Sequence, residues 1–215
     1  MREKTIEAIE KEKIIVIVRG VAREKLIPFA EAMYLGGIRL IECTFDASGK
    51  TSDAETGENI RLLSEHFGEK MLVGAGTVLT EKQVEITKTS GGKFIISPDT
   101  NPAVIKKTVE LGLVSLPGAF TPTEIVNASR SGADFVKVFP IDRMGPRYIS
   151  DLKAPLSHIK LLAVGGIDKD NMVDYLNAGA YGVGVGSAIV NKKLIAEGKF
   201  EEITKLAADF CNKVR

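Results

Sequence analysis

A lysine stands in the middle of an apolar run with the length of a buried strand, DFVKVFP (134–140). The two-residue period of a strand places Phe135, Lys137 and Phe139 on one face, and the two valines on the other. Burial disfavours the charged ammonium form and lowers its pKa, and only a neutral amine attacks a carbonyl carbon. Lys137 is therefore a candidate for a lysine that forms a Schiff base, rather than one that extends to solvent.

A glutamate has the matching position in a second apolar run, RLIECTF (39–45). Leu40, Glu42 and Thr44 share one face of this strand, and the opposite face is wholly apolar. A carboxylate beside an amine that must form, protonate and release an imine suits a general acid and base. The alternative is a buried structural ion pair with Lys137, although such pairs rarely stabilise a protein more than apolar side chains would.

Glycine-rich strand ends could hold the anionic groups of a substrate. AVGGID (163–168) and GVGSA (184–188) each run from a strand toward a helix, so backbone N–H groups and helix N-termini would point at one region. GAGTVL (74–79) brings the hydroxyl of Thr77 to the end of its strand. Arg19, at the end of the first strand, could bind a carboxylate through two parallel hydrogen bonds.

These residues belong to a repeating pattern of strands and helices. Segments with helical spacing separate the apolar runs, and such alternation predicts a parallel sheet. The runs are IIVIV (14–18), RLIECTF (39–45), MLVGAG (71–76), KFIIS (93–97), LVSLPG (113–118), DFVKVFP (134–140), IKLLAVGG (159–166) and YGVGVGS (181–187).

Eight such units predict a (β/α)8 TIM barrel, an α/β fold, formed by a single domain over residues 1–215. An open doubly wound sheet would carry a glycine-rich fingerprint after its first strand, and VRGVAREK lacks one. We expect an extra helix in the first ~12 residues and another from Phe200 to Arg215. The longest connection, residues 44–59, follows the second strand and would lie at the C-terminal face, where barrel loops carry function.

The composition of the chain excludes several classes of partner and cofactor. The chain has 29 basic and 28 acidic residues, so its net charge indicates neither nucleic acid nor an anionic membrane as partner. No apolar run reaches the ~18 residues of a membrane span. Cys43 and Cys211 lie far apart, and His66 and His158 have no partners at ligand spacing, so we expect no metal, no cofactor and a cytoplasmic protein acting on a small molecule.

Several segments, in order over nearly the whole chain, are similar to those of the 2-keto-3-deoxy-6-phosphogluconate / 4-hydroxy-2-oxoglutarate (KDPG/KHG) aldolases. The resemblance implies a class I aldolase on a (β/α)8 barrel, commonly a homotrimer, that cleaves a phosphorylated keto acid to pyruvate and glyceraldehyde 3-phosphate. It rests on LIECTF, GAGTVLT, ISPDTNP, LPGAFTPTE, FVKVFP, GPRYI, VGGI and GVGS.

The resemblance also implies a role for each matching residue. Lys137 corresponds to the Schiff-base lysine and Glu42 to the acid/base. The remaining matches are Arg19, Thr77, Pro98 and Phe139 around the pyruvyl group, and Gly165, Gly166, Gly186 and Ser187 at the phosphate.

The chain departs from the family pattern at two positions that bear on specificity. Asp46 stands where many members have arginine, which would leave carboxylate binding to Arg19. Val164 stands where gluconate-type members often have threonine, as in members resembling 2-keto-3-deoxy-6-phosphogalactonate aldolases. Asp99 also replaces a more usual glycine or histidine.

The sequence is also consistent with two functions that do not involve an imine. One is a barrel that binds a phosphorylated ligand without using Lys137 chemically, and the other is a phosphate-barrel isomerase, which VGGI and GVGS alone would suit.

Overall fold

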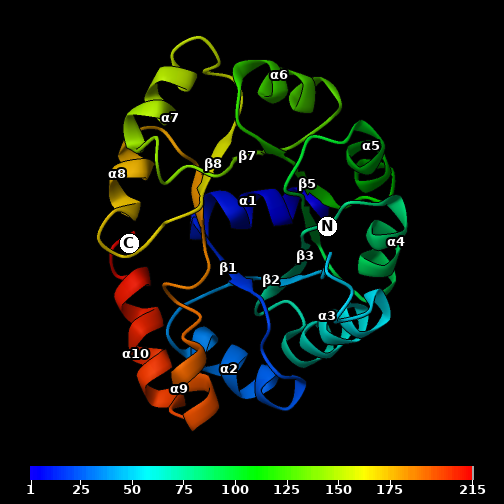
Figure 1. The fold of residues 1–215 in the computed structure, drawn as a ribbon, viewed down its shortest axis with the longest axis vertical. Helices are drawn as coiled ribbons and strands as arrows, with labels where there is room; N and C mark the ends of the chain where they lie inside the picture. The colour runs from blue at the N-terminus through cyan, green and yellow to red at the C-terminus, as the bar shows by residue number, and fades with distance from the viewer. Residues whose placement is uncertain (215) are drawn as a thin grey trace.

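The computed structural model describes residues 1–214 as a ring of parallel strands surrounded by helices (Figure 1). The strands are β1 (Ile14–Val18), β2 (Leu40–Thr44), β3 (Leu72–Gly76), β4 (Phe94–Ile96), β5 (Val114–Leu116), β6 (Gly118–Ala119), β7 (Val136–Val138), β8 (Leu161–Val164) and β9 (Gly182–Val185). The helices are α1 (Arg2–Glu12), α2 (Arg23–Leu35), α3 (Asp53–Phe67), α4 (Glu81–Thr89), α5 (Pro102–Glu110), α6 (Pro122–Arg130), α7 (Pro146–Lys153), α8 (Met172–Asn177), α9 (Lys192–Glu197) and α10 (Phe200–Cys211).

The predicted (β/α)8 barrel is confirmed, and its fifth strand is divided in two. The sheet order is β5-β4-β3-β2-β1-β9-β8-β7-β6, and β5 and β6 flank Pro117 within the single predicted strand 113–118. Proline has no backbone N–H to donate to a ladder, which accounts for the break. The carbonyl of Pro117 still accepts from the N–H of Lys137 at 2.9 Å, so hydrogen bonding continues on that side of the segment.

The alternating side chains of the strands fill two separate regions. Outward residues such as Val16, Ile41 and Val136 pack against the surrounding helices. Inward residues such as Ile15, Leu40 and Phe135 form a smaller cluster inside the barrel. Side chains that alternate along a strand were predicted to point in turn into the barrel and toward the helices, and the structure agrees.

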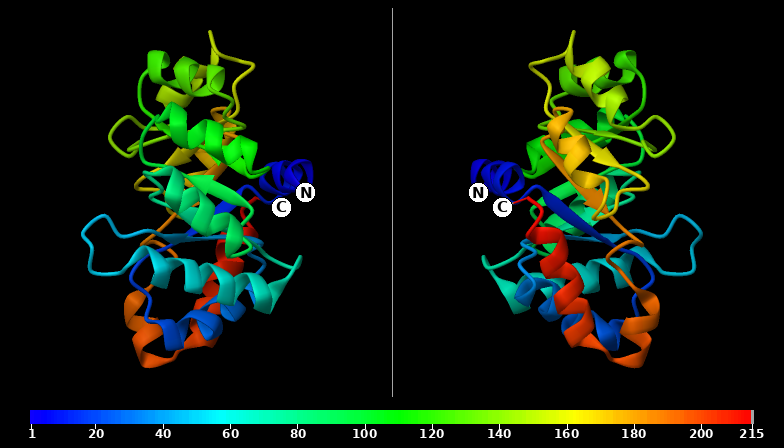
Figure 2. Two further views of the ribbon diagram at one scale, coloured as in Figure 1. Left: turned by 90° about the vertical axis from the view of Figure 1, so that its right-hand side faces the viewer. Right: turned by 90° about the vertical axis from the view of Figure 1, so that its left-hand side faces the viewer.

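Helix α1 closes the N-terminal end of the barrel. Its Ile9 is fully buried in the inner cluster, and the guanidinium of Arg2 pairs with Asp134 at 2.7 Å. Figure 2 shows α1 at one end of the molecule and the loop before α3 at the other. Access to the barrel interior is therefore left at the C-terminal face. The predicted terminal helices correspond to α1 and α10, and Arg215 lies outside the described residues.

Candidate active site at the C-terminal face

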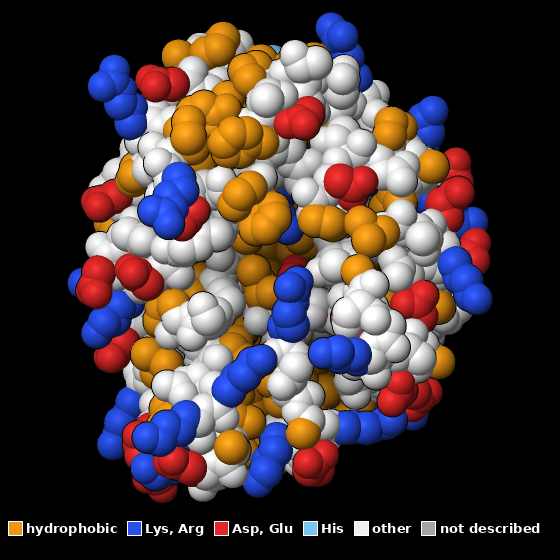
Figure 3. Space-filling model, in the orientation of Figure 1, with side chains coloured by type: hydrophobic (Ala, Val, Ile, Leu, Met, Phe, Trp, Pro, Cys, Tyr) orange, Lys and Arg blue, Asp and Glu red, His pale blue; other side chains and the backbone are white. Residues whose placement is uncertain are grey.

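A cavity of about 820 Å³ opens at the C-terminal ends of the strands. Figure 3 shows the hollow at the centre of this face, with basic side chains beside it and apolar side chains on its rim. Every predicted site residue except Asp46 lines it: Arg19, Glu42, Thr77, Pro98, Lys137, Phe139, Val164, Gly165, Gly166, Gly186 and Ser187. Residues from seven strand ends thus converge on one space, although they span most of the chain.

Lys137 and Glu42 lie in the floor of this cavity. They project inward from β7 and β2, and only 8% and 2% of their surfaces are exposed. No ion pair within 4.0 Å joins these two side chains, so the predicted alternative of a direct structural salt bridge does not describe this arrangement. The Lys137 ammonium lies 4.6 Å from the centre of the Phe139 ring, on the same face of the strand.

Burial dominates the electrostatics of Glu42. It raises the pKa of the carboxyl to about 7, although the positive charges of Lys137 and Arg19 act in the opposite direction. One oxygen, Oε2, is buried and makes no hydrogen bond within the described residues. A carboxyl with a pKa near neutrality can both accept and return a proton at pH 7.

Glycine at position 76 makes room for that carboxyl group. A Cβ atom at Gly76 would collide with Oε1 of Glu42, and would also lie 3.1 Å from Cγ2 of Thr44. The bare end of β3 therefore allows Glu42 to occupy the axis of the barrel. This gives the glycine of the GAGT segment a specific steric role.

Burial also lowers the pKa of Lys137. The negative charges of Glu42 and Asp99 oppose this shift, and the positive charge of Arg19 adds to it. A lowered pKa increases the fraction of neutral amine, which is the form that attacks a carbonyl. The buried position of Lys137 thus gives it the lowered pKa that its apolar sequence context predicted.

Arg19 and Thr77 form a polar pair at the side of the cavity. The Arg19 guanidinium donates to the Thr77 hydroxyl at 2.9 Å. Thr77 has a φ of 57°, in the left-handed region that a β-branched residue rarely adopts. Such strained residues persist where the surroundings hold them, often at functional sites. The pair presents a hydroxyl and a forked cation to the same space, which suits a carboxylate.

Two glycine-containing turns, after β8 and β9, also line the cavity. Gly165 and Gly166 have φ values of 105° and 68°, which only glycine adopts without strain. A Cβ at Gly166 would also collide with Asp142. Neither turn leads directly into a helix as predicted, because α8 begins at Met172 and α9 at Lys192. The backbone N–H groups available here therefore belong to turns rather than to helix N-termini.

Asp46 has a local structural role. Its carboxylate accepts hydrogen bonds from the backbone and hydroxyl of Ser48 and from the N–H of Thr51, and these bonds lower its pKa. It therefore stabilises the loop after β2 and does not line the cavity. That loop is also shorter than predicted, because α3 begins at Asp53 with a capping box between Ser52 and Glu55.

Other lining residues were not predicted from the sequence. They are Ile17, Ile167, Gly184, Val190, Asn191 and Lys192. Only Lys192 among them is charged. The sequence signal was weak, because Asn191 and Lys192 resemble an ordinary helix start, and Asn191 indeed caps α9 through the N–H of Lys193 and Leu194.

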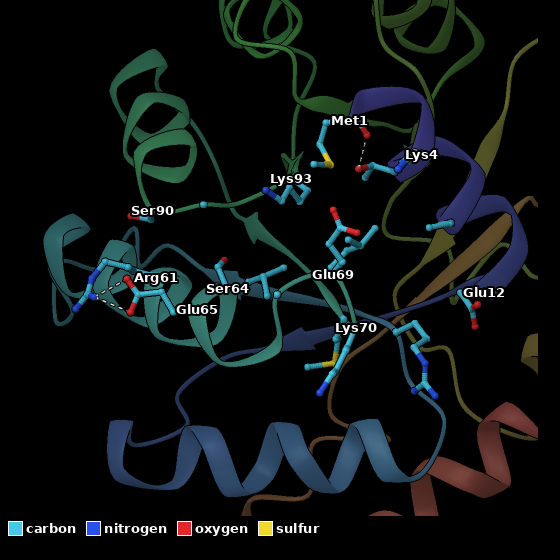
Figure 4. A pocket seen from close by; sticks show the side chains of 18 of the residues that line it. Met1, Lys4, Glu12, Arg61, Ser64, Glu65, Glu69, Lys70, Ser90 and Lys93 are labelled. Carbon is cyan, nitrogen blue, oxygen red and sulfur yellow. Dashed lines mark hydrogen bonds and ion pairs between the residues drawn. The ribbon is translucent and has the colours of Figure 1, made fainter.

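A second cavity, of about 560 Å³, lies at the N-terminal end beside α1. Figure 4 shows Lys4, Glu69 and Lys93 around it, with Arg61 bound to Glu65 at its edge. Its acidic and basic side chains are mixed, and no strand C-terminus reaches it, so barrel chemistry is not expected there. Within residues 1–214, no cluster of three or more His, Cys, Asp or Glu could hold a metal ion. No helix in that range is long and apolar enough to span a bilayer.

The chain is similar to known proteins over most of its length. A family model described as KDPG and KHG aldolase matches residues 5–206. The 2-dehydro-3-deoxy-6-phosphogalactonate aldolase of Escherichia coli is 33% identical over 178 residues, covering 82% of this chain and 84% of that protein. A 2-dehydro-3-deoxy-phosphogluconate aldolase of Haemophilus influenzae is 32% identical over 217 residues, covering 99% and 98%.

Solved structures share the fold closely. The KDPG aldolase of Legionella pneumophila superposes with a TM-score of 0.84 at 26% identity, covering 94% of this chain and 96% of that one. That structure is described as containing pyruvate captured as a covalent carbinolamine intermediate.

Proposed function

Because the chain belongs to the KDPG and KHG aldolase family, we propose that it is a class I aldolase that cleaves 2-keto-3-deoxy-6-phosphogluconate to pyruvate and glyceraldehyde 3-phosphate. The observation that carries the proposal is the pair of buried groups, Lys137 and Glu42, at the floor of one cavity. Burial moves both pKa values toward neutrality. Opposite shifts in neighbouring groups are the pattern expected of an amine nucleophile and its acid/base.

In the proposed reaction, the neutral amine of Lys137 attacks the C2 ketone, and loss of water gives a protonated imine. The carboxylate of Glu42 takes the proton of the C4 hydroxyl as the C3–C4 bond breaks. The bonding electrons pass to the imine, which becomes an enamine, and the aldehyde product leaves. Protonation of the enamine at C3 and hydrolysis of the imine release pyruvate and restore Lys137. The imine accepts the electrons, so this sequence needs no metal or other cofactor.

The remaining residues of the cavity hold the two ends of the substrate. Arg19 and Thr77 bind the C1 carboxylate, and Pro98 and Phe139 form the walls around the pyruvyl group. The turns of Gly165–Gly166 and Gly186–Ser187 bind the phosphate. A cavity of about 820 Å³ that is lined by both sets of residues supports a substrate with two anionic groups.

A second candidate is the 2-keto-3-deoxy-6-phosphogalactonate epimer, which Val164 and the identity to the Escherichia coli galactonate enzyme favour. 4-Hydroxy-2-oxoglutarate, cleaved to pyruvate and glyoxylate, is a further substrate in the proposal. The same family membership leads us to propose a homotrimer.

The test is a panel of these three acids, with kcat/KM measured from pyruvate release. The proposal predicts cleavage of the gluconate-derived acid, with turnover of the galactonate epimer as well. Preference for the galactonate epimer alone would select the second candidate. Absence of pyruvate release from all three would contradict the aldolase proposal and favour a barrel that only binds a phosphorylated ligand.

A further inference from the structure

The phosphate end of the cavity combines neutral donors with one cationic side chain. The backbone N–H groups of Gly166 and Ser187 have no acceptor among the described residues, and the Ser187 side chain borders the same space. Neutral donors of this kind bind anions, but they do not neutralise the charge of about −1.5 to −2 that a phosphate carries at pH 7. The cation, Lys192, lies in the same lining.

The position of Lys192 depends on a glycine far away in the sequence. Its Nζ would lie 3.3 Å and its Cε 3.9 Å from a Cβ atom at Gly20, the residue after Arg19. The side chain therefore crosses from the start of α9 to the end of β1. The absent side chain of Gly20 leaves room for it. Lys192 lines the same cavity as the Gly186–Ser187 turn.

Lys192 makes no ion pair within 4.0 Å among residues 1–214, although it also borders a smaller hollow that includes Glu24. Its neighbour Lys193 differs, because it does not line the cavity. The two adjacent lysines thus share charge and sequence context but differ in where their side chains lie. Lys193 is therefore a control that distinguishes a charge inside the cavity from the general positive charge of the surface.

We propose that Lys192 is the counter-ion of the substrate phosphate and makes the site select phosphorylated keto acids over unphosphorylated ones. The inference rests on the proposed aldolase function for its substrate, but phosphate binding itself does not require turnover. A lysine acts as a compact point charge toward phosphate, and its attraction for an anion is weakened by salt. Since Lys192 is exposed, its contribution is smaller than that of a buried charge.

The first experiment measures binding of inorganic phosphate by 31P NMR titration in wild type, Lys192→Ala, Lys192→Arg and Lys193→Ala. We expect Lys192→Ala to weaken binding by roughly 5- to 20-fold, reflecting loss of one charge-assisted contact at an exposed site. Lys192→Arg should retain most of the affinity, and Lys193→Ala should match wild type. The difference between wild type and Lys192→Ala should shrink as ionic strength rises.

The second experiment compares kcat/KM for the phosphorylated acid and for its unphosphorylated counterpart. Lys192→Ala should reduce the preference for the phosphorylated acid by roughly the same 5- to 20-fold, mainly through KM. An unchanged preference, equal losses in Lys192→Ala and Lys193→Ala, or no phosphate binding by wild type would overturn the proposal. Lys192-dependent phosphate binding by a protein that releases no pyruvate would instead leave this site standing and reject the aldolase.

Discussion

At the scale of single residues, Lys137 and Glu42 occupy positions where burial opposes the charge that each normally carries. The period of two in their strands predicted that both point inward, because alternation on a strand follows from backbone geometry alone. Asp46, predicted to affect specificity, does not line the cavity, and Lys192, which does line it, was not predicted. The Asp46 carboxylate accepts hydrogen bonds from its own loop, and the Lys192 side chain lies in space that Gly20 leaves open. Both positions result from tertiary packing, which residue spacing in the sequence does not reveal.

Replacement of Glu42 by glutamine tests its part in proton transfer. Glu42→Gln keeps the shape of the side chain but cannot exchange the proton, so kcat should fall by roughly 10²- to 10⁴-fold. Because burial raises the pKa of Glu42 to about 7, wild-type cleavage should lose activity as pH falls below that value, when the base becomes protonated. Steady-state kinetics between pH 5 and 9 would measure both effects. Wild-type rates in the glutamine variant would assign Glu42 a structural role.

Val164 offers an isosteric test of stereochemical preference. It is buried at the end of β8 and lines the cavity, and its methyl groups would lie 2.8 and 3.2 Å from a Cβ at Gly184. Val164→Thr adds a hydroxyl there with little change in shape, so one substrate hydroxyl can gain a hydrogen bond. We expect the kcat/KM ratio to move toward the gluconate-type epimer by roughly 2- to 10-fold. An unchanged ratio would mean that the epimers are distinguished elsewhere.

At the scale of the elements, the positions of strands were predictable and the details of their ends were not. All predicted strand runs contain an observed strand, since apolar β-branched segments between glycines are a strong signal. The break at Pro117 and the turns that delay α8 and α9 depend on how the ends of neighbouring strands meet. The glycine-rich segments nevertheless line the cavity, as their positions at strand ends predicted.

The space that Gly76 leaves at the end of β3 can be tested by substitution. Gly76→Ala must displace the Glu42 carboxyl, and displacement of a catalytic group by about 1 Å can cost roughly 10²-fold in rate. Gly74→Ala is the matched control, because its Cβ would meet the Phe94 ring instead. We expect Gly74→Ala to lower stability with a smaller effect on kcat. Equal kcat values in the two folded variants would contradict the steric role of Gly76.

At the scale of the whole molecule, the closed barrel with α1 across its N-terminal end excludes water from the base of the site. This enclosure is the physical source of the raised pKa of Glu42, and it links the site to global stability. Above pH 4.5 the unfolded chain releases the proton of Glu42, whereas the folded protein retains it up to about pH 7. The free energy of unfolding should therefore contain a contribution that is lost as pH rises through this window.

The size of that contribution follows from the shift from 4.5 to about 7, which corresponds to about 3 kcal/mol. Urea unfolding of wild type and Glu42→Gln at pH 4.5 and pH 8 would measure it. Relative to the glutamine variant, wild type should be less stable at pH 8 than at pH 4.5 by about that amount. Lys137 is present in both proteins, but the charge of Glu42 raises its pKa, so the measured difference belongs to the coupled pair. A difference that does not vary with pH would contradict the burial of an ionising carboxyl.

Formation of an imine on Lys137 can be measured by borohydride reduction in the presence of pyruvate, followed by mass spectrometry of the intact protein and its peptides. We predict one reduced pyruvyl adduct per chain, located on Lys137, and none in a Lys137→Ala variant that circular dichroism shows to be folded. Lys153→Ala, which changes a lysine outside the cavity lining, should still form the adduct. No adduct in wild type, or an adduct on another lysine, would contradict imine formation on Lys137.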